Sequence, residues 1–148
     1  MTQAPQFRQA GPADADTLRA IAEAAFALYV PRIGRRPAPM DADFAADAAD
    51  TLLLLAPDPC GYLTLRRAPG EMVVETVALH PAWQGRGLGK LLMARAEAEA
   101  RAAGLGTLSL YTNAAMTENL AFYPRLGFRR TGQRTEDGFD RVFFARDL

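Results

Sequence analysis

The stretch ETVALHPAWQGRGLGKLLMARAEAEARAA, Glu75 to Ala103, decides the fold. Its pattern predicts an apolar strand that ends at Leu79, a turn rich in glycine, and a helix. His80-Pro81 closes the strand, because a proline restricts the residue before it. A glycine-rich turn that opens a helix binds anions, since glycine lets the backbone approach closely and the first helical N–H groups have no partner. The stretch therefore predicts a phosphate site.

Two common phosphate motifs do not fit this turn. A P-loop needs a glycine where Gln84 stands and a serine or threonine where Leu91 follows Lys90. A dinucleotide fingerprint needs the spacing G-x-G-x-x-G and an acidic residue after the next strand, but the chain has G-x-G-x-G and the next strand ends in Tyr111-Thr112-Asn113. The pattern that remains is Q-x-x-G-x-G, which begins at Gln84.

The composition is that of a globular protein. The chain has 148 residues, 49% hydrophobic and 23% charged, which predicts a single domain over residues 1–148. Its net charge of zero argues against nucleic acid or an anionic membrane as the main partner. The single cysteine, Cys60, excludes an internal disulfide, and the first residues lack the pattern of a signal peptide. We therefore expect a cytoplasmic protein.

The rest of the chain predicts short strands and helices around this stretch. Strands are expected at about 7–9, 52–56, 61–67, 72–79, 107–111, 128–134 and 139–145. Helices are expected from the region of Asp14 and Asp16 to Pro31, at Asp41–Asp50 and at Met116–Arg125, and residues 31–39 read as an irregular loop with three arginines. The predicted fold class is α+β (mixed α/β), with about seven mostly antiparallel strands, one central parallel pair and helices on both faces.

Two motifs carry a resemblance to a known family. The strand, His80-Pro81 and the Q-x-x-G-x-G turn resemble the acetyl-CoA-binding motif of the GNAT acetyltransferase superfamily. The segment NLAFYPRLGF, Asn119 to Phe128, is similar to the GNAT segment in which a short helix carries a tyrosine and ends in Leu-Gly-Phe. The resemblance implies a GNAT-like fold and an acetyl-CoA-dependent N-acetyltransferase that needs no metal and acetylates a primary amine directly.

The resemblance also implies where acetyl-CoA binds. The pyrophosphate would meet the glycine turn, and pantetheine would pair with the edge of the strand that ends at Leu79. The family often has an asparagine at the position of Met116, and here Asn113 or Asn119 would take its role. The residues expected to bind acetyl-CoA are Val77, Ala78, Leu79, Gln84, Gly85, Arg86, Gly87, Leu88, Gly89, Lys90, Asn113 and Asn119.

Two residues are candidates for proton transfer. Glu75 is a charged residue inside an apolar strand, on the same face as Val77 and Leu79, and could accept a proton from the amine through water. The alternative for Glu75 is a structural ion pair at the rim of the sheet, and His80 is a rival base. Tyr123 matches the family's general acid by position; its alternative is a core tyrosine beside Phe122 and Phe128.

The acceptor is the part that the sequence defines least. By resemblance it would enter beside the first helices, where Tyr29, Arg32, Arg35 and Met40 are candidate contacts. Arginines there could bind a carboxylate or phosphate of the acceptor, or they could be solvated or touch a CoA phosphate. We expect a small-molecule or peptide amine as acceptor and a monomer or homodimer. The alternative function is a non-catalytic acyl-CoA-binding or sensor domain.

Overall fold

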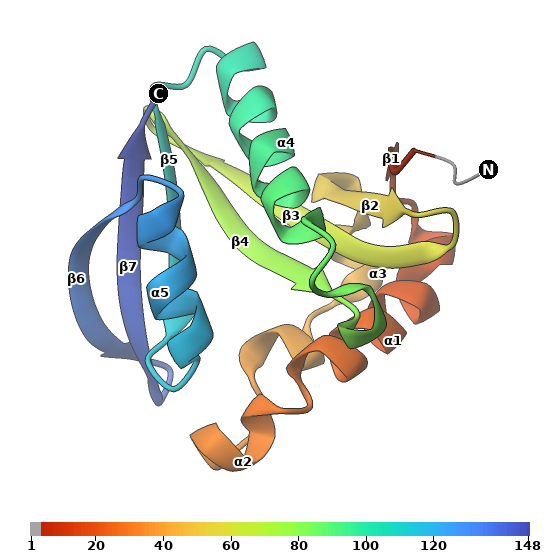
Figure 1. The fold of residues 1–148 in the computed structure, drawn as a ribbon, viewed down its shortest axis with the longest axis horizontal. Helices are drawn as coiled ribbons and strands as arrows, with labels where there is room; N and C mark the ends of the chain where they lie inside the picture. Colours follow the sequence, from red (N-terminus) through yellow and green to blue (C-terminus); the bar gives the residue numbers. More distant parts are fainter. Residues whose placement is uncertain (1–3) are drawn as a thin grey trace. The chain divides into compact units, whose positions relative to one another are not determined.

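The computed structural model describes residues 4–148, which form seven strands and five α-helices (Figure 1). The strands are ordered β1-β2-β3-β4-β5-β7-β6, and β4 and β5 pair in parallel. The pairs β1–β2, β2–β3, β5–β7 and β6–β7 are antiparallel. The elements are β1 (Gln6–Gln9), α1 (Ala15–Phe26), α2 (Tyr29–Ile33), α3 (Phe44–Asp47), β2 (Thr51–Leu55), β3 (Pro59–Ala68), β4 (Glu71–Leu79), α4 (Leu88–Ala102), β5 (Thr107–Asn113), α5 (Thr117–Arg125), β6 (Arg129–Glu136) and β7 (Phe139–Asp147).

The predicted fold class is confirmed, with seven mostly antiparallel strands and one parallel pair. Each predicted strand lies within two residues of an observed one. The chain divides into two compact units: the described residues up to Leu65 with Thr76–Arg95, and Arg66–Glu75 with Ala96–Leu148. The expected single domain stays a prediction. Across the described residues, no helix has the length and apolar character needed to span a bilayer.

In the first unit, α1 buries one face that includes Leu18, Ile21, Ala22 and Phe26. Leu53, Leu54 and Leu63 of β2 and β3 are also fully buried in this unit. Phe44 of α3 packs edge to face against Tyr62 of β3, with the ring centroids 6.5 Å apart. These strands and helices therefore form an apolar core that supports the end of β4.

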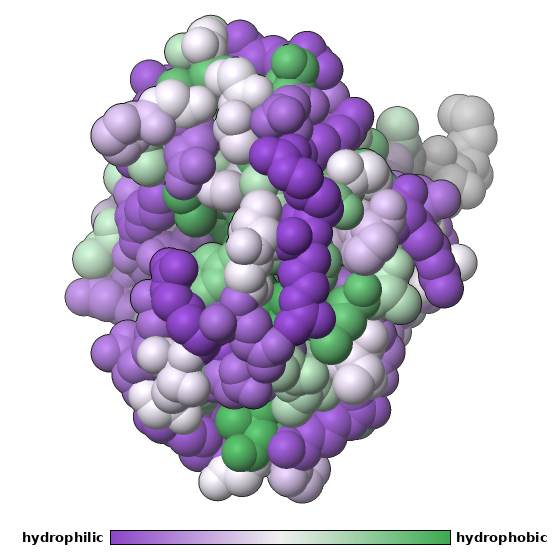
Figure 2. Space-filling model, turned by 90° about the vertical axis from the view of Figure 1, so that its left-hand side faces the viewer, coloured by the Kyte–Doolittle hydropathy of each residue, from purple (hydrophilic) through white to green (hydrophobic). Residues whose placement is uncertain are grey.

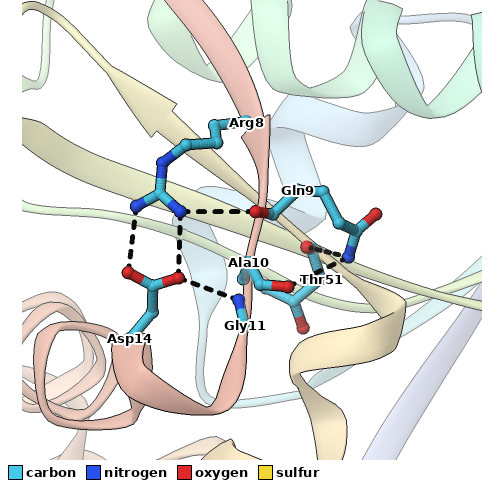
Figure 3. A network of polar contacts seen from close by, with 6 residues as sticks. All are labelled: Arg8, Gln9, Ala10, Gly11, Asp14 and Thr51. Carbon is cyan, nitrogen blue, oxygen red and sulfur yellow. Dashed lines mark hydrogen bonds and ion pairs between the residues drawn. The ribbon is translucent and has the colours of Figure 1, made fainter.

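The corner between β1 and α1 is held by polar contacts (Figure 3). The Arg8 guanidinium donates two hydrogen bonds to the Asp14 carboxylate, at 3.0 and 2.9 Å. Asp14 also accepts the Gly11 N–H at 2.8 Å, and it makes no side-chain cap bond to α1. The Gln9 amide donates to the Thr51 carbonyl at 3.0 Å. These bonds fasten β1 to the chain before α1 and to the start of β2.

The region between α1 and β2 differs from the prediction. Pro31 was expected to end a helix, but it is the third residue of α2, where the missing N–H costs nothing because the first helical N–H groups have no helical partner. Gly34 ends α2 at φ +84°. The helix predicted at Asp41–Asp50 is instead a 3₁₀ turn, α3 and a second 3₁₀ turn, because the Asp43 side chain accepts the Ala46 N–H and starts α3 anew.

In the second unit, α5 runs alongside β7 (Figure 1). Tyr123 of α5 is 4% exposed, and its ring lies 5.8 Å from those of Phe128 and Phe144. Pro124 lies in the last turn of α5, and just beyond it the Leu126 N–H bonds three residues back, to the Tyr123 carbonyl at 3.0 Å. The aromatic contacts fix α5 on the sheet of this unit.

The hairpin of β6 and β7 forms an edge of the sheet. Its turn has positive φ at Asp137 and Gly138, the signature of a tight hairpin. Nearly all of β6 is exposed, and the space-filling view from its side is mostly hydrophilic (Figure 2). Polar residues on an edge strand disfavour pairing with another chain. Arg141 of β7 is buried, with its guanidinium 4.5 Å from the centre of the Tyr111 ring.

Candidate functional site

The segment after β4 is a short capped turn in the first unit. The His80 N–H donates to the Cys60 carbonyl at 2.8 Å, which ties the end of β4 to β3. The His80 Nδ1 accepts the Ala82 N–H at 3.1 Å and so caps the 3₁₀ turn Pro81–Trp83. The Trp83 ring packs edge to face on the His80 ring, with the centroids 5.3 Å apart. His80 therefore has a structural role at the start of the glycine turn.

The glycine turn has the backbone geometry of an anion site. Gly85 and Gly87 have φ of +80° and +77°, which side chains other than glycine rarely adopt. A Cβ built on either glycine would meet none of the described residues within 4 Å, so the turn faces open space. The exposed side chains beside it include Arg86 and Lys90, which add positive charge.

The helix after the turn presents unpaired N–H groups. In α4 the Leu91 N–H donates to the Gly87 carbonyl at 3.2 Å. The N–H groups of Leu88, Gly89 and Lys90 precede this bond, in the first turn of a helix, where N–H groups have no intrahelical acceptor. Together with the helix dipole, they can stabilise a bound phosphate.

The parallel pairing of β4 and β5 covers only part of β4. The register runs from Glu71 opposite Thr107 to Val74 opposite Leu110. β4 continues to Leu79, while β5 stays paired with β7 as far as Asn113 opposite Arg141. The predicted pantetheine residues Val77, Ala78 and Leu79 thus belong to the part of β4 beyond this ladder.

The two candidate asparagines have different partners in the second unit. The Asn113 Oδ1 accepts the Ala115 N–H at 2.9 Å and closes the turn after β5. The Asn119 amide donates to the Thr112 hydroxyl at 3.1 Å, from the first turn of α5. Met116, at the family's usual asparagine position, is buried next to both Thr112 and Asn119. The Asn119 amide thus lies next to the Met116 sulfur, and Asn113 closes the turn after β5.

Glu75 and Tyr123 both have defined surroundings in the second unit. Arg66 of β3 contacts the Glu75 carboxylate through Nε at 3.0 Å and Nη2 at 2.9 Å. Both side chains are 35% exposed, so the pair is accessible to water. Tyr123 is enclosed by aromatic rings, including that of Phe122 at 5.3 Å. These contacts are compatible with the structural alternatives and with roles in proton transfer.

The candidate acceptor residues lie on and near α2 in the first unit. The Arg32 guanidinium stacks over the Tyr29 ring at 5.3 Å. Arg35 is exposed, whereas Arg36 forms ion pairs with Glu23 and Asp41 and so stabilises the connection after α2. The Met40 side chain is only 4% exposed and packs in the core. Of the four candidate contacts, Arg32 and Arg35 are exposed, Tyr29 is partly exposed and Met40 is buried.

The sequence model described as the acetyltransferase (GNAT) family matches residues 18–128, well over half of the chain. The chain belongs to this family. The resemblance inferred from the two motifs is confirmed, and the family is one of acyltransferases, the enzyme class expected from the sequence.

Two curated relatives and a solved structure agree with the GNAT assignment. The chain is 46% identical over 66 residues to the mycothiol acetyltransferase of Cellulomonas flavigena, and 37% identical over 89 residues to the N-alpha-acetyltransferase 80 of Mus musculus. These matches cover 43% and 53% of the chain but only 19% and 27% of the relatives. The PaiA N-acetyltransferase of Thermoplasma acidophilum, solved with coenzyme A, has the same fold, with a TM-score of 0.77, 15% identity, and coverage of 95% of this chain and 98% of that one.

Two residues near the candidate GNAT site were not found from the sequence. Gly61 of β3 allows a close approach to β4, because a Cβ there would lie 2.7 Å from the Ala78 carbonyl oxygen. A glycine inside a predicted strand was the available signal. Arg66 was missed because the hairpin register that brings it to Glu75 could not be read from the sequence.

No group of three or more His, Cys, Asp or Glu residues in the described part of the chain could hold a metal ion.

Proposed function

We propose that the protein transfers the acetyl group of acetyl-CoA directly to a primary amine. The observation that carries the proposal is the glycine turn that opens α4, where Gly85 and Gly87 have positive φ and the first helical N–H groups have no intrahelical acceptor. This turn lies within the residues that match the GNAT family.

The CoA molecule would bind at the glycine turn and the end of β4. The N–H groups from Gly85 to Lys90, with the side chains of Gln84, Arg86 and Lys90, would hold the pyrophosphate. The backbone of Val77, Ala78 and Leu79 would bind pantetheine, which the end of the β4–β5 ladder at Val74 supports. We also assign Asn119 and Asn113 to the binding of pantetheine. When bound, acetyl-CoA supplies an activated acetyl thioester.

The chain must also supply two proton transfers. A lysine-like amine with a pKa of ~10.4 is neutral in roughly one molecule per thousand at pH 7, a cost of about 4–5 kcal/mol. Glu75, which is 35% exposed, would take the proton from the ammonium group through a water molecule, so that the neutral nitrogen can form the amide bond. Tyr123 would donate its hydroxyl proton to the thiolate that leaves when the carbon–sulfur bond breaks, and the second proton that the nitrogen loses would restore the Tyr123 hydroxyl.

The acceptor is proposed from the residues of α2. Arg32 and Arg35 would bind an acidic group, and the Tyr29 ring would pack against the body of the acceptor. The favoured class is therefore a small molecule or peptide that carries an amine and a carboxylate or phosphate. The single free cysteine, Cys60, supports a reducing compartment such as the cytoplasm.

A thiol-release assay tests the proposal. The protein is incubated with acetyl-CoA and a panel of amines with and without an acidic group, and free CoA thiol is measured with a chromogenic disulfide. Amine-dependent release is the expected result. Binding of acetyl-CoA without release on any amine would overturn the enzymatic proposal and favour an acyl-CoA-binding domain.

A further inference from the structure

We infer that Arg66 is a positioning residue that holds one oxygen of the Glu75 carboxylate and leaves the other to receive the proton of the amine. The inference rests on the proposed function, because it gives Arg66 a role only if Glu75 acts as the base. It adds a residue of β3 that none of the sequence motifs indicates.

The geometry of the pair is one-sided. The Nε and Nη2 atoms of Arg66 both contact Oε2 of Glu75, at 3.0 and 2.9 Å. A bidentate pair would place one nitrogen on each carboxylate oxygen. The hydrogen bonds and ion pairs of Glu75 recorded among the described residues all fall on Oε2, and the side chain is 35% exposed. Oε1 therefore keeps its lone pairs for water or an amine.

The position of Glu75 in the sheet supports a role for its charge. Glu75 directly follows Val74, the last residue of β4 in the ladder with β5. Burial raises the pKa of Tyr111, the residue after Leu110 in β5, and the negative charge of Glu75 is among the further causes that raise it. The carboxylate thus lies close enough to the end of the ladder to influence Tyr111.

Arg66 would act by restricting the carboxylate. A glutamate has three side-chain torsions, and free rotation would spread Oε1 over many orientations. The hydrogen bond from Nε and the ion-pair contact from Nη2, both to Oε2, restrict the direction of the group. A proton acceptor held in one place increases the fraction of encounters with productive geometry. The proton passes to Oε1, while Oε2 stays bonded to Arg66.

An ion pair at the rim of a sheet that only stabilises the fold would have the same distances. The two roles differ in whether the effect of Arg66 depends on Glu75. We therefore propose a double-mutant cycle with wild type, Arg66→Ala, Glu75→Gln and the double variant, measured for kcat, both KM values and the melting temperature with and without acetyl-CoA. Arg146→Ala is the matched control, because it removes another arginine–glutamate ion pair. Arg146 pairs with Glu97 at 3.0 Å, and the two side chains are 34% and 23% exposed, respectively.

We expect Arg66→Ala to lower kcat about tenfold and to leave the KM for acetyl-CoA within about twofold. In the Glu75→Gln background the same substitution should change kcat by less than about twofold. Arg66→Lys keeps a cation and should recover part of the lost kcat, and Arg146→Ala should retain wild-type kcat. The melting-temperature shift caused by acetyl-CoA should be the same in all four proteins of the cycle.

Other outcomes overturn the inference in distinguishable ways. Equal loss of kcat from Arg66→Ala in both backgrounds would show that Arg66 acts independently of Glu75. Unchanged kcat in Arg66→Ala would remove its role altogether, and wild-type kcat in Glu75→Gln would remove the base on which it acts, although the acetyltransferase activity would stand. If wild type binds acetyl-CoA but no amine of the panel causes thiol release, the proposed function fails, and the inference fails with it.

Discussion

At the scale of single residues, Tyr123 combines a packed ring with the hydroxyl that we propose as the general acid. Its ring is buried against Phe122, Phe128 and Phe144. The hydroxyl is a small part of that contact surface, so it can be removed with the ring left in place. This separation allows the proposed general acid to be tested without a change of the core.

Tyr123→Phe should lower kcat by about ten- to a thousandfold, within or just below the range typical of general acids. Residual activity is expected, because a thiol with a pKa of ~8.5 leaves tolerably well as a thiolate. The KM for acetyl-CoA and the melting temperature should change little. Steady-state kinetics measure kcat and the KM, and thermal unfolding measures the melting temperature. If kcat equals that of wild type with the best acceptor, Tyr123 is only a core residue.

Glu75→Gln keeps the shape of the side chain and removes its ability to take a proton. We expect the largest loss of kcat near pH 7 and the smallest near pH 10, because an amine with a pKa of ~10.4 loses its proton unaided there. A pH–rate profile of both proteins measures this difference. A uniform loss at every pH would instead indicate a structural or binding role.

At the scale of elements, the turn between β4 and α4 combines a backbone conformation that glycine adopts readily with an open surface. Gly87→Val should abolish the rise in melting temperature that acetyl-CoA causes, because a branched side chain disfavours φ of +77° and intrudes where phosphate would bind. The matched control is Gly70→Val, in the hairpin between β3 and β4, with φ of +73° and the same open surroundings. It should lose stability but keep the acetyl-CoA shift. Equal shifts in both variants would contradict the pyrophosphate site.

The Arg8–Asp14 ion pair at the corner between β1 and α1 should make the stability of the fold depend on pH. The Arg8 guanidinium, with the Gly11 N–H, lowers the pKa of Asp14 from 3.8 to about 2. A carboxyl with a lowered pKa stabilises the fold above its ordinary pKa, and this contribution is lost as the pH falls through the folded value. Asp14→Asn should therefore melt below wild type at pH 6 and converge with it between about pH 4 and pH 2.

Thermal unfolding from pH 2 to pH 6 measures this convergence. Asp16→Asn is the control, because the Asp16 side chain is 98% exposed and its pair with Arg19 contributes little. It should follow wild type across the range. A constant difference between Asp14→Asn and wild type at every pH would show that the Asp14 charge is not responsible.

At the scale of the whole molecule, binding of acetyl-CoA should stabilise the protein. At a hundredfold excess over its dissociation constant, a ligand contributes about 2.7 kcal/mol, or about 5–10 °C for a chain of this size. Differential scanning fluorimetry with acetyl-CoA measures the shift, and an equal concentration of acetate serves as the control. Absence of a shift at saturating acetyl-CoA would contradict the proposed binding site.

Most of the architecture follows from local patterns in the chain. Alternating strands separated by proline and glycine, and the turn at Gly85–Gly89, can be read directly because each depends on neighbouring residues. The segment around Pro31 was misread because proline is tolerated in the first turn of a helix. The Arg66–Glu75 ion pair and the close approach of Gly61 to β4 could not be predicted, because both depend on contacts between strands that a single sequence does not reveal.

The burial of Cys60 gives the protein an internal chemical reporter. It is the only cysteine, its side chain has no exposure, and burial raises the pKa of its thiol. Because the thiolate is the reactive form, the folded chain should react slowly with disulfide reagents. Assays of released CoA should therefore have a low background from the protein itself. The labelling rate of Cys60 would also report how often the first unit opens, with no added probe.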